Sequence, residues 1–368
     1  MTLLGAAAGE RGSSKLLDRG LSSPNACDGR LARRSAEREG GPRVSVVVLN
    51  HNYGCYLKQC LDSVLAQDYE PLEVIVVDDG STDDSRAVIE SYDGRVISAF
   101  KPNGGVASTM NRGFALSHGS VVIFVDADDF LLPGAVADHV RAHRDPEVVR
   151  SQAYLTILKE APYPLDTIPG EPPGEGDLCD LVLARGPGAF ISAPQSGNAW
   201  ARRYLEQVIP LPETLKGIGA DSLLMDTAPL FGKIVALKTG PRAVYRVHNN
   251  GMNAAKAGLT PAQIRKTVAR QEARACRLEE VATSLGHAVD RSEWKSRSWR
   301  LLTLDYLAGR LGDEGMIVPL TTHLRPVWRV RGNALKRLFL AAALLCIRIA
   351  PTRLSLVLTG RIINPRYL

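Results

Sequence analysis

Three carboxylates follow an apolar run in the first half of the chain. Residues 121–125 are all hydrophobic, and Asp126, Asp128 and Asp129 come directly after them. A buried strand that ends in clustered acids places negative charge at the carboxyl edge of a sheet, where open α/β folds bind ligands. Such carboxylates repel one another unless a cation or hydrogen-bond donors hold them, and Mg²⁺ and Mn²⁺ favour oxygen ligands. Acids at strand ends are common, so the surrounding elements decide whether the triplet is a site.

Those elements alternate between strand and helix. Nearly continuous apolar runs, as expected of strands covered on both faces, occur at residues 44–49, 73–77, 95–100 and 121–125. Helical spacing of apolar residues separates them, at residues 56–65 and 107–116. This alternation predicts the α/β class, with a mostly parallel sheet and helices on both faces. Helical patterns at residues 259–285 and 292–311 predict a helical C-terminal extension.

Short motifs stand at the ends of the predicted strands and at the starts of the helices. They are Asn52, Asp78-Asp79-Gly80-Ser81, Asn103-x-Gly105, Asn111-Arg112-Gly113 and Asp126-x-Asp128-Asp129. In order and spacing, densest over residues 44–140, they resemble the family 2 glycosyltransferases of GT-A fold. The family usually has Pro after the first strand where this chain has Asn50-His51-Asn52, a difference that concerns the loop near the nucleobase.

The resemblance implies a nucleotide diphospho-sugar donor, most often with uridine. The donor-binding candidates are Asn52, Asp78, Asp79, Asn103, Gly105, Arg112, Asp126 and Asp128. Asp79, with Asp78 beside it, would accept the N–H of a uracil ring. Asn103 and Gly105 would let the backbone come close to the nucleotide, since small residues leave room. Arg112 either pairs with a phosphate or is a surface arginine.

The resemblance also implies a metal site and a general base. Asp126 would lie near the ribose, and Asp128 would ligate Mg²⁺ or Mn²⁺, bridging the pyrophosphate. His248, in a Tyr-Arg-x-His segment, is either a second metal or phosphate ligand or a structural histidine. The base that takes the acceptor proton in inverting transfer is predicted to be Asp221. Its alternatives are a simple N-cap role for Asp221 and the rival base Asp226.

Two further segments resemble the acceptor side of the family. The acceptor-side candidates are Ser196, Asn198 and Arg246. The first two belong to Gln195-Ser196-Gly197-Asn198, where a strand would present polar groups to the sugar. Arg246 could neutralise a phosphate.

Charge, hydrophobicity and cysteine content indicate where in the cell this protein acts. The chain has 368 residues and a net charge of +6, and after Glu314 it has nine Lys and Arg residues and no Asp or Glu. Such a tail suits an anionic membrane surface, a nucleic acid or an acidic partner. The apolar run at residues 338–347 is shorter than the roughly 20 residues needed to span a bilayer, so it predicts either an interfacial anchor or a helix packed on the catalytic domain. Scattered cysteines favour reduced thiols in the cytoplasm, with the protein either free or peripheral at the inner face of the membrane.

The predicted organisation has three parts. Residues 1–43 form a disordered arm, residues 44–255 the GT-A catalytic domain, and residues 256–368 a helical region with the basic tail. Within the catalytic domain, residues 44–140 are the nucleotide-sugar half and residues 141–255 the acceptor half.

The leading hypothesis is a metal-dependent inverting glycosyltransferase that acts on a saccharide or lipid-linked acceptor, in cell-surface polysaccharide or glycolipid synthesis. A nucleotidyltransferase of related fold would need a Gly-rich, basic phosphate loop after the first strand, where this chain has Asn50-His51-Asn52. A non-catalytic membrane-surface protein leaves the acid clusters unexplained. No nucleic-acid partner is expected, because no binding signature for one occurs.

Overall fold

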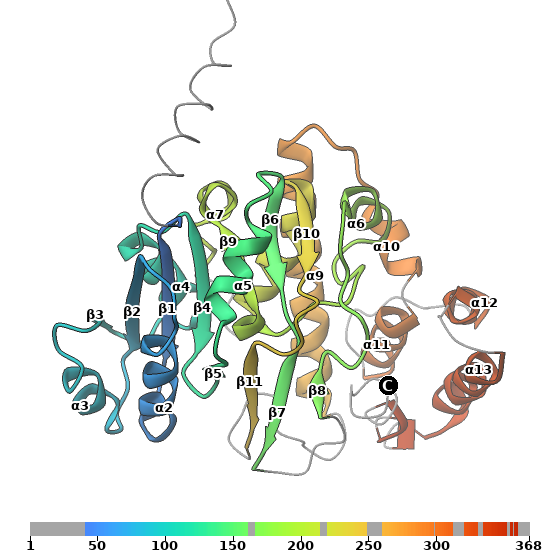
Figure 1. Cartoon of the computed structure of the whole chain (residues 1–368). Coiled ribbons are helices and arrows are strands. Elements are labelled where there is room, and N and C mark those ends of the chain that lie inside the picture. Colours follow the sequence, from blue (N-terminus) through green and yellow to red (C-terminus); the bar gives the residue numbers. More distant parts are fainter. Residues whose placement is uncertain are drawn as a thin grey trace, which may run out of the picture. The chain divides into compact units, whose positions relative to one another are not determined.

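The main element of the fold is a seven-stranded sheet (Figure 1). Its strands are β1 (Val44–Asn50), β2 (Leu72–Asp79), β3 (Ile97–Lys101), β4 (Val121–Asp126), β6 (Val148–Gln152), β9 (Asn198–Ala201) and β10 (Lys233–Ala236). Their spatial order is β10-β6-β9-β4-β1-β2-β3. The acid cluster begins at the last residue of β4. Only β9 is antiparallel to its neighbours β4 and β6. The predicted α/β class with a mostly parallel sheet is confirmed.

The computed structural model describes residues 41–160, 166–213, 219–248, 260–297, 299–311, 320–329, 334–351, 354–355 and 357–359. Residues 41–368 form one compact unit. The predicted N-terminal arm therefore lies outside the described residues, apart from its last three. The end of the basic tail lies outside them too.

Helices cover both faces of this sheet because successive side chains of each strand point in opposite directions. Val46 and Val48 of β1 enter one core with helix α2, whereas Val47 and Leu49 enter a second core with helix α4. The helices beside the sheet are α2 (Gly54–Leu65), α3 (Ser85–Glu90), α4 (Val106–Leu116), α5 (Ala135–Ala142), α7 (Arg202–Val208) and α8 (Ala220–Thr227). Helix α6 (Cys179–Arg185) packs against the C-terminal helices. Short 3₁₀ turns, η1 (Gln195–Gly197) and η2 (Ala228–Leu230), precede β9 and follow α8.

A smaller four-stranded sheet brings distant segments to the acid cluster. Its order is β5-β11-β7-β8, with β5 (Phe130–Leu131), β7 (Leu155–Lys159), β8 (Thr167–Ile168) and β11 (Ala243–Val247). Strand β5 begins directly after Asp129, and β11 is antiparallel to it. The residue that follows β11 is therefore placed beside the acids.

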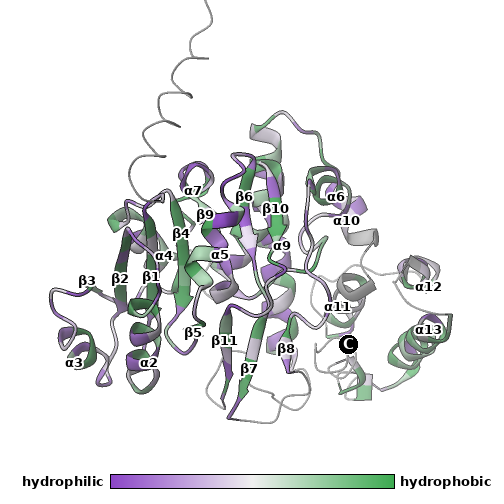
Figure 2. Cartoon of the chain, in the orientation of Figure 1, coloured by the Kyte–Doolittle hydropathy of each residue, from purple (hydrophilic) through white to green (hydrophobic). Residues whose placement is uncertain are grey.

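The C-terminal region is helical, as predicted. Its elements are α9 (Pro261–Ser284), α10 (Arg291–Arg297), α11 (Trp299–Arg310), α12 (Leu320–Leu324), η3 (Arg325–Arg329) and α13 (Ala334–Ile349). Thr260 and Gln263 form a capping box at the start of α9, satisfying backbone N–H groups that the helix leaves open. Within the described residues, no helix has the length and apolar content to cross a membrane. Figure 2 shows hydrophobic residues along the strands of the large sheet and along α13.

Candidate functional site

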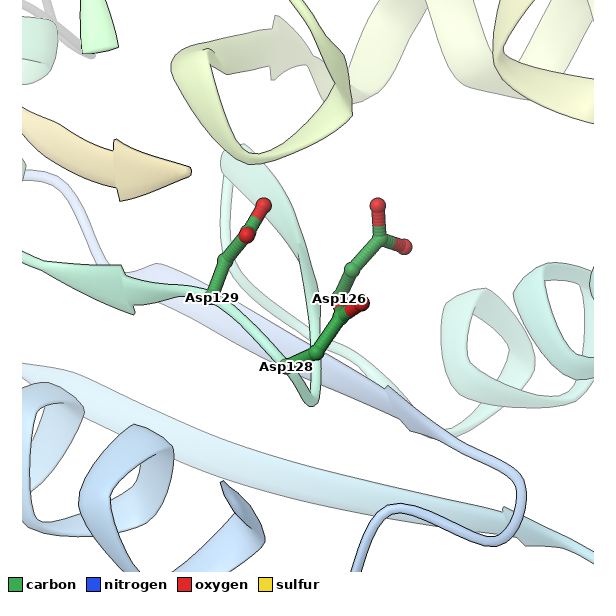
Figure 3. Close-up of side chains that lie close together, drawn as sticks. All are labelled: Asp126, Asp128 and Asp129. Atoms are coloured by element: carbon green, nitrogen blue, oxygen red, sulfur yellow. The ribbon is translucent and has the colours of Figure 1, made fainter. Parts of the chain in front are cut away.

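Asp126, Asp128 and Asp129 converge where β4 ends (Figure 3). One carboxylate oxygen from each lies within 4.8 Å of the others. Asp126 is the last residue of β4, and the backbone N–H of Asp129 donates to the Asp126 carbonyl at 2.9 Å, which closes the turn. The predicted strand-end placement therefore produces a group of ligands of the size that one cation can bridge.

Two segments far along the chain hold this turn. The Ser196 hydroxyl donates to Oδ2 of Asp129 at 2.7 Å and accepts the backbone N–H of Asp126 at 3.1 Å. The backbone N–H of Arg246 donates to Oδ1 of Asp129 at 3.0 Å. Asp129 thus anchors the turn, and the other two carboxylates remain available to a ligand.

The electrostatics of the turn favour a cation. Burial, followed by the charges of Asp128 and Asp129, raises the pKa of Asp126 well above its ordinary value. Burial and the charge of Asp128 raise the pKa of Asp129 to about 8. Clustered, desolvated carboxylates gain most from a hard divalent ion, which offsets their repulsion. The ligand set therefore fits Mg²⁺ or Mn²⁺.

His248 lies beside Asp128, as the metal-ligand prediction requires. Its Nε2 is 3.2 Å from Oδ2 of Asp128, and its side chain is 6% exposed. The rings of Tyr53 and Tyr56 flank it, with centroids at 5.7 and 5.1 Å. Burial and the charge of Asp128 raise the pKa of Tyr53 to about 12, which keeps its hydroxyl protonated. We did not single out these tyrosines from the sequence, although they stand one helical turn apart at the start of α2.

The Arg246 guanidinium is engaged within the protein. It forms an ion pair with Glu160, and it donates to Oε1 of Gln59 at 2.6 Å and to the Asp128 carbonyl at 2.9 Å. Tyr56 donates to the same Glu160 carboxylate at 3.0 Å. Arg246 therefore holds the Asp128 backbone. Glu160, which no sequence motif marked, completes its surroundings.

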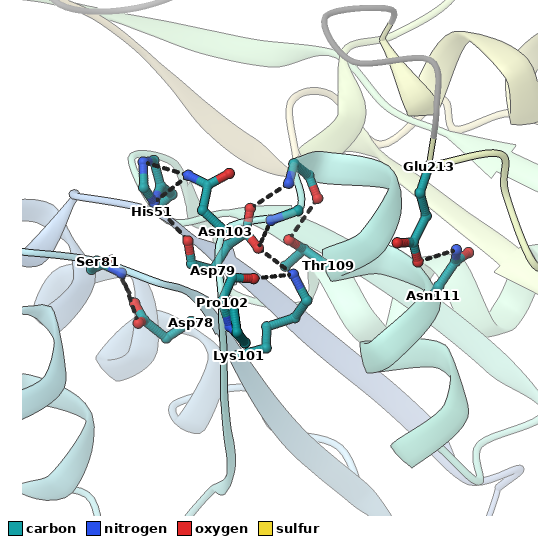
Figure 4. Close-up of polar contacts among 12 residues, drawn as sticks. His51, Asp78, Asp79, Ser81, Lys101, Pro102, Asn103, Thr109, Asn111 and Glu213 are labelled. Carbon is teal, nitrogen blue, oxygen red and sulfur yellow. Dashed lines mark hydrogen bonds and ion pairs between the residues drawn. The ribbon is translucent and has the colours of Figure 1, made fainter.

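The loops predicted to bind the nucleobase meet around Asp79 (Figure 4). This buried carboxylate pairs with Lys101 and accepts the backbone N–H groups of Gly104 at 2.8 Å and Gly105 at 2.7 Å. A Cβ on Gly80 would approach a backbone nitrogen of the same loop to 2.7 Å, so glycine permits the two loops to meet. Asp79 retains one open lone-pair direction on Oδ2 in this arrangement.

Asp78 and Asn52 join the loops after β1 and β2. Asp78 accepts from the Asn50 amide at 2.7 Å and from the hydroxyl and backbone N–H of Ser81. Asn52, at a positive φ of 57°, accepts the backbone N–H of Thr82 at 2.7 Å. Both candidates therefore shape the loops, and Asp78, like Asp79, accepts three hydrogen bonds.

The remaining donor-side candidates differ in exposure and bonding. The Asn103 amide contacts the His51 ring at 3.0 Å, and His51 in turn contacts the Asp79 carbonyl (Figure 4). Arg112 is exposed on α4 and forms no hydrogen bond or ion pair with any residue in the described ranges. The structure thus places Arg112 at the surface and Asn103 in contact with the loop after β1.

Asp221 and Asp226 have different surroundings on α8. Asp226 is buried and accepts two hydrogen bonds from Arg274 of α9, at 2.6 and 2.7 Å. Asp221 accepts one hydrogen bond, from the backbone of Ser222, and burial raises its pKa. Its charge also contributes to the raised pKa of Asp126, which places the two carboxylates within electrostatic reach. The glycines predicted before Asp221 lie partly outside the described residues.

Asn198 is fully buried beneath the site. Its amide oxygen accepts from Nε of Arg150 at 2.9 Å, and its amide nitrogen donates to the backbone of residues 193–195. Arg150 is itself fully buried and donates to Gln152 and Ser192. This network holds η1, the turn that carries Ser196, so the Asn198 side chain acts on the site through the backbone.

Comparisons with known proteins agree with this geometry. The model of the family described as glycosyl transferase family 2 matches residues 45–188. An uncharacterized glycosyltransferase of Nostoc is 36% identical over 222 residues, which are 58% of this chain and 68% of that protein. Chondroitin synthase of Pasteurella multocida is 40% identical over 98 residues, a tenth of its own length. The crystal structure of S. aureus TarS 1–349 in complex with UDP-GlcNAc has a TM-score of 0.51 at 19% identity, covering 83% of this chain and 91% of that one, which shows the shared fold.

Proposed function

The chain belongs to glycosyltransferase family 2, and on that premise we propose that it transfers a sugar, with inversion, from a nucleoside diphosphate donor to a saccharide or lipid-linked acceptor. Synthesis of a surface polysaccharide or glycolipid is the setting that fits. The observation that carries the donor site is the convergence of Asp126, Asp128 and Asp129 within 4.8 Å, with His248 at 3.2 Å from Asp128. Neither alternative hypothesis accounts for the family membership.

Asp128 and His248 would hold the divalent cation. An Asp oxygen and a neutral imidazole nitrogen are both ligands that Mn²⁺ accepts, and a carboxylate suits Mg²⁺. Bound there, Mg²⁺ or Mn²⁺ supplies positive charge to the leaving nucleoside diphosphate. Asp126 would face the ribose, and Asp129 holds the turn through Ser196 and Arg246.

The nucleobase would bind between the loops after β1 and β2. Its N–H would donate to the open direction on Asp79, whose other lone pairs are taken by Lys101 and the glycine backbone. Asn52, Asn103 and Gly105 would form the walls of this pocket. Arg112, exposed on α4, would reach a phosphate only as a flexible surface side chain.

Asp221 would act as the general base. It has one oxygen that no described residue hydrogen-bonds, whereas both oxygens of its rival Asp226 are held by Arg274. The raised pKa makes Asp221 a stronger proton acceptor than an ordinary aspartate. Ser196, Asn198 and Arg246, predicted for the acceptor side, would shape that side by holding η1 and the acid turn.

The test is a calorimetric titration with UDP, with and without Mn²⁺, because TarS, which shares this fold, has been solved with UDP-GlcNAc. Binding should need the metal, and Asp128→Asn and His248→Gln should each weaken it at least about tenfold. Asp93→Asn, a matched change at an exposed aspartate in the turn after α3, should leave it unchanged.

Two results would contradict the proposal. Metal-dependent binding that survives both substitutions would remove Asp128 and His248 from the metal site. Failure to bind UDP, GDP and dTDP with metal present would overturn the donor assignment itself.

A further inference from the structure

Helix α13 has two apolar faces, of which one is packed. Leu340, Leu344 and Ile347 are at most 2% exposed and join Ile264 of α9 and Leu307 of α11 in a C-terminal core. The spacing of the three α13 residues, four and then three apart, places them on one side of the helix. This side packs on the C-terminal helices, whereas one alternative predicted for the run at residues 338–347 was a helix packed on the catalytic domain.

The opposite side of α13 is apolar and open. Leu335, Leu338, Phe339 and Ile349 are 74%, 55%, 68% and 79% exposed. Ala342, Leu345 and Cys346 are also exposed and fall on the same side at 100° per residue. These seven residues, the α13 stripe, run the length of the helix and include no polar side chain.

The stripe is where exposed hydrophobic surface concentrates in this protein. Among the described residues, every large apolar side chain that is at least half exposed lies between Trp328 and Leu354. Trp328, 52% exposed, belongs to η3, which packs beside α13. Single exposed hydrophobic residues are ordinary, but a continuous apolar patch marks an interaction surface. Tryptophan in particular favours the boundary between lipid and water.

The charge of the C-terminal segment favours one partner for the stripe. Residues 315–368 contain nine Lys and Arg and no Asp or Glu. A second copy of this region would bring the same positive charge against its own, so self-association through the stripe is opposed electrostatically. An anionic lipid surface attracts such a segment, and its acyl chains accept the apolar side chains.

We propose that α13 lies in the plane of an anionic membrane surface, with the α13 stripe inserted at the boundary between headgroups and acyl chains. The helix is about 24 Å long, which is short of the roughly 30 Å of a bilayer core, and its other face is held by the C-terminal core. It therefore lies on the membrane and does not cross it. This surface goes beyond the proposed transfer reaction and does not depend on the donor or on Asp221.

The experiment is cosedimentation of the full chain with phosphatidylcholine vesicles, with and without phosphatidylglycerol. The wild-type protein should bind the anionic vesicles at least tenfold more tightly than the neutral ones, and added salt should weaken binding. Leu335→Ser/Phe339→Ser/Ile349→Ser should lose at least tenfold in binding. Because these side chains are mostly exposed, the variant should keep its thermal transition and its nucleotide binding.

Ile97→Ser/Leu285→Ser is the matched control, since both side chains are exposed but lie outside the stripe. It should bind vesicles like the wild type. Three results would overturn the proposal: no binding of the wild type to anionic vesicles, equal binding by the triple variant, or a wild-type dimer in light scattering that the triple variant abolishes. The nucleotide titration of the same variants is a separate readout, so failure of the transferase proposal and failure of this one are distinguishable.

Discussion

A buried pair of histidines makes the stability of this fold depend on pH. His139 of α5 is 1% exposed, and its Nδ1 lies 2.7 Å from the hydroxyl of Ser151 on β6. Nε2 of His143 lies 3.1 Å from the same oxygen. A hydroxyl has one proton to donate and two lone pairs that accept, so Ser151 can donate to one imidazole and accept from the other. The arrangement is satisfied by two neutral rings.

The pKa values have the same implication. Burial, and then the neighbouring His143, lowers the pKa of His139 from 6.5 to about 3. The charge of Arg242 lowers this pKa further, whereas the charge of Asp138 raises it. Burial lowers the pKa of His143 to about 4, with a contribution from Arg203 and against a backbone hydrogen bond to Ala199. The unfolded chain therefore binds protons at a pH where the folded protein does not. This stabilisation is complete above pH 6.5 and is lost as pH falls toward the folded-state values.

The size of the effect follows from the unfolded-state pKa. About one pH unit below 6.5, each histidine costs about 1.4 kcal/mol of stability, provided that its folded-state pKa is well below that pH. His143 keeps some exposure, so its share is the smaller. The pair should therefore lower the free energy of unfolding by about 2–3 kcal/mol between about pH 8 and about pH 5.5.

Urea unfolding at the two pH values measures this difference. In His139→Gln/His143→Gln, which keeps polar side chains but removes the titration, the difference should shrink by about 2–3 kcal/mol. His287→Gln is the matched control, since this half-buried histidine lies outside the pair and its replacement should leave the difference as it is in the wild type. Identical pH dependence in the wild type and the double variant would refute the reasoning.

Three other predictions follow from the site and its supports. Asp221→Asn should slow transfer by about 10²–10⁴-fold without weakening UDP binding, and unchanged turnover would exclude this role. Because the base must be ionised, the wild-type rate should fall with decreasing pH, with an apparent pKa above the ordinary 3.8 of Asp. Arg274→Leu leaves Asp226 buried and unpaired, so urea unfolding should show a loss of about 3–5 kcal/mol, which Arg274→Leu/Asp226→Leu should largely restore. Gly80→Ala should lose about 1–3 kcal/mol, more than Gly94→Ala, because both glycines have a φ of 71° but only the first Cβ would meet another loop; equal losses would contradict this.

The central sheet was predictable because its strands are covered on both faces. Residues 44–49 and 121–125 are all buried. The sequence therefore shows continuous apolar runs there and not an alternation of apolar and polar residues. The edge strand was placed less accurately: β3 begins at Ile97 rather than residue 95, and Ile97 itself is exposed. A strand with one open face leaves a weaker pattern.

The prediction that Asp128 and His248 belong to one site depended on the resemblance to a family. The two residues stand 120 positions apart, and no local pattern states that β11 returns beside β5. The buried role of Asn198 had no signal at all, because a polar residue in a short segment is usually exposed. Its partner Arg150 lies on a different strand, and only the fold brings the two together.

The C-terminal helices contribute to the placement of the proposed base, although the predicted boundary separates residues 255 and 256. Arg274 of α9 holds Asp226 of α8 by two hydrogen bonds, and the Trp294 indole donates to the Leu183 carbonyl of α6 at 2.7 Å. Both contacts cross that boundary. Because Arg274 occupies both oxygens of Asp226, Asp221 is left as the carboxylate of α8 with an oxygen open to an acceptor hydroxyl. The α9 helix therefore occupies Asp226, the rival of the base that we propose.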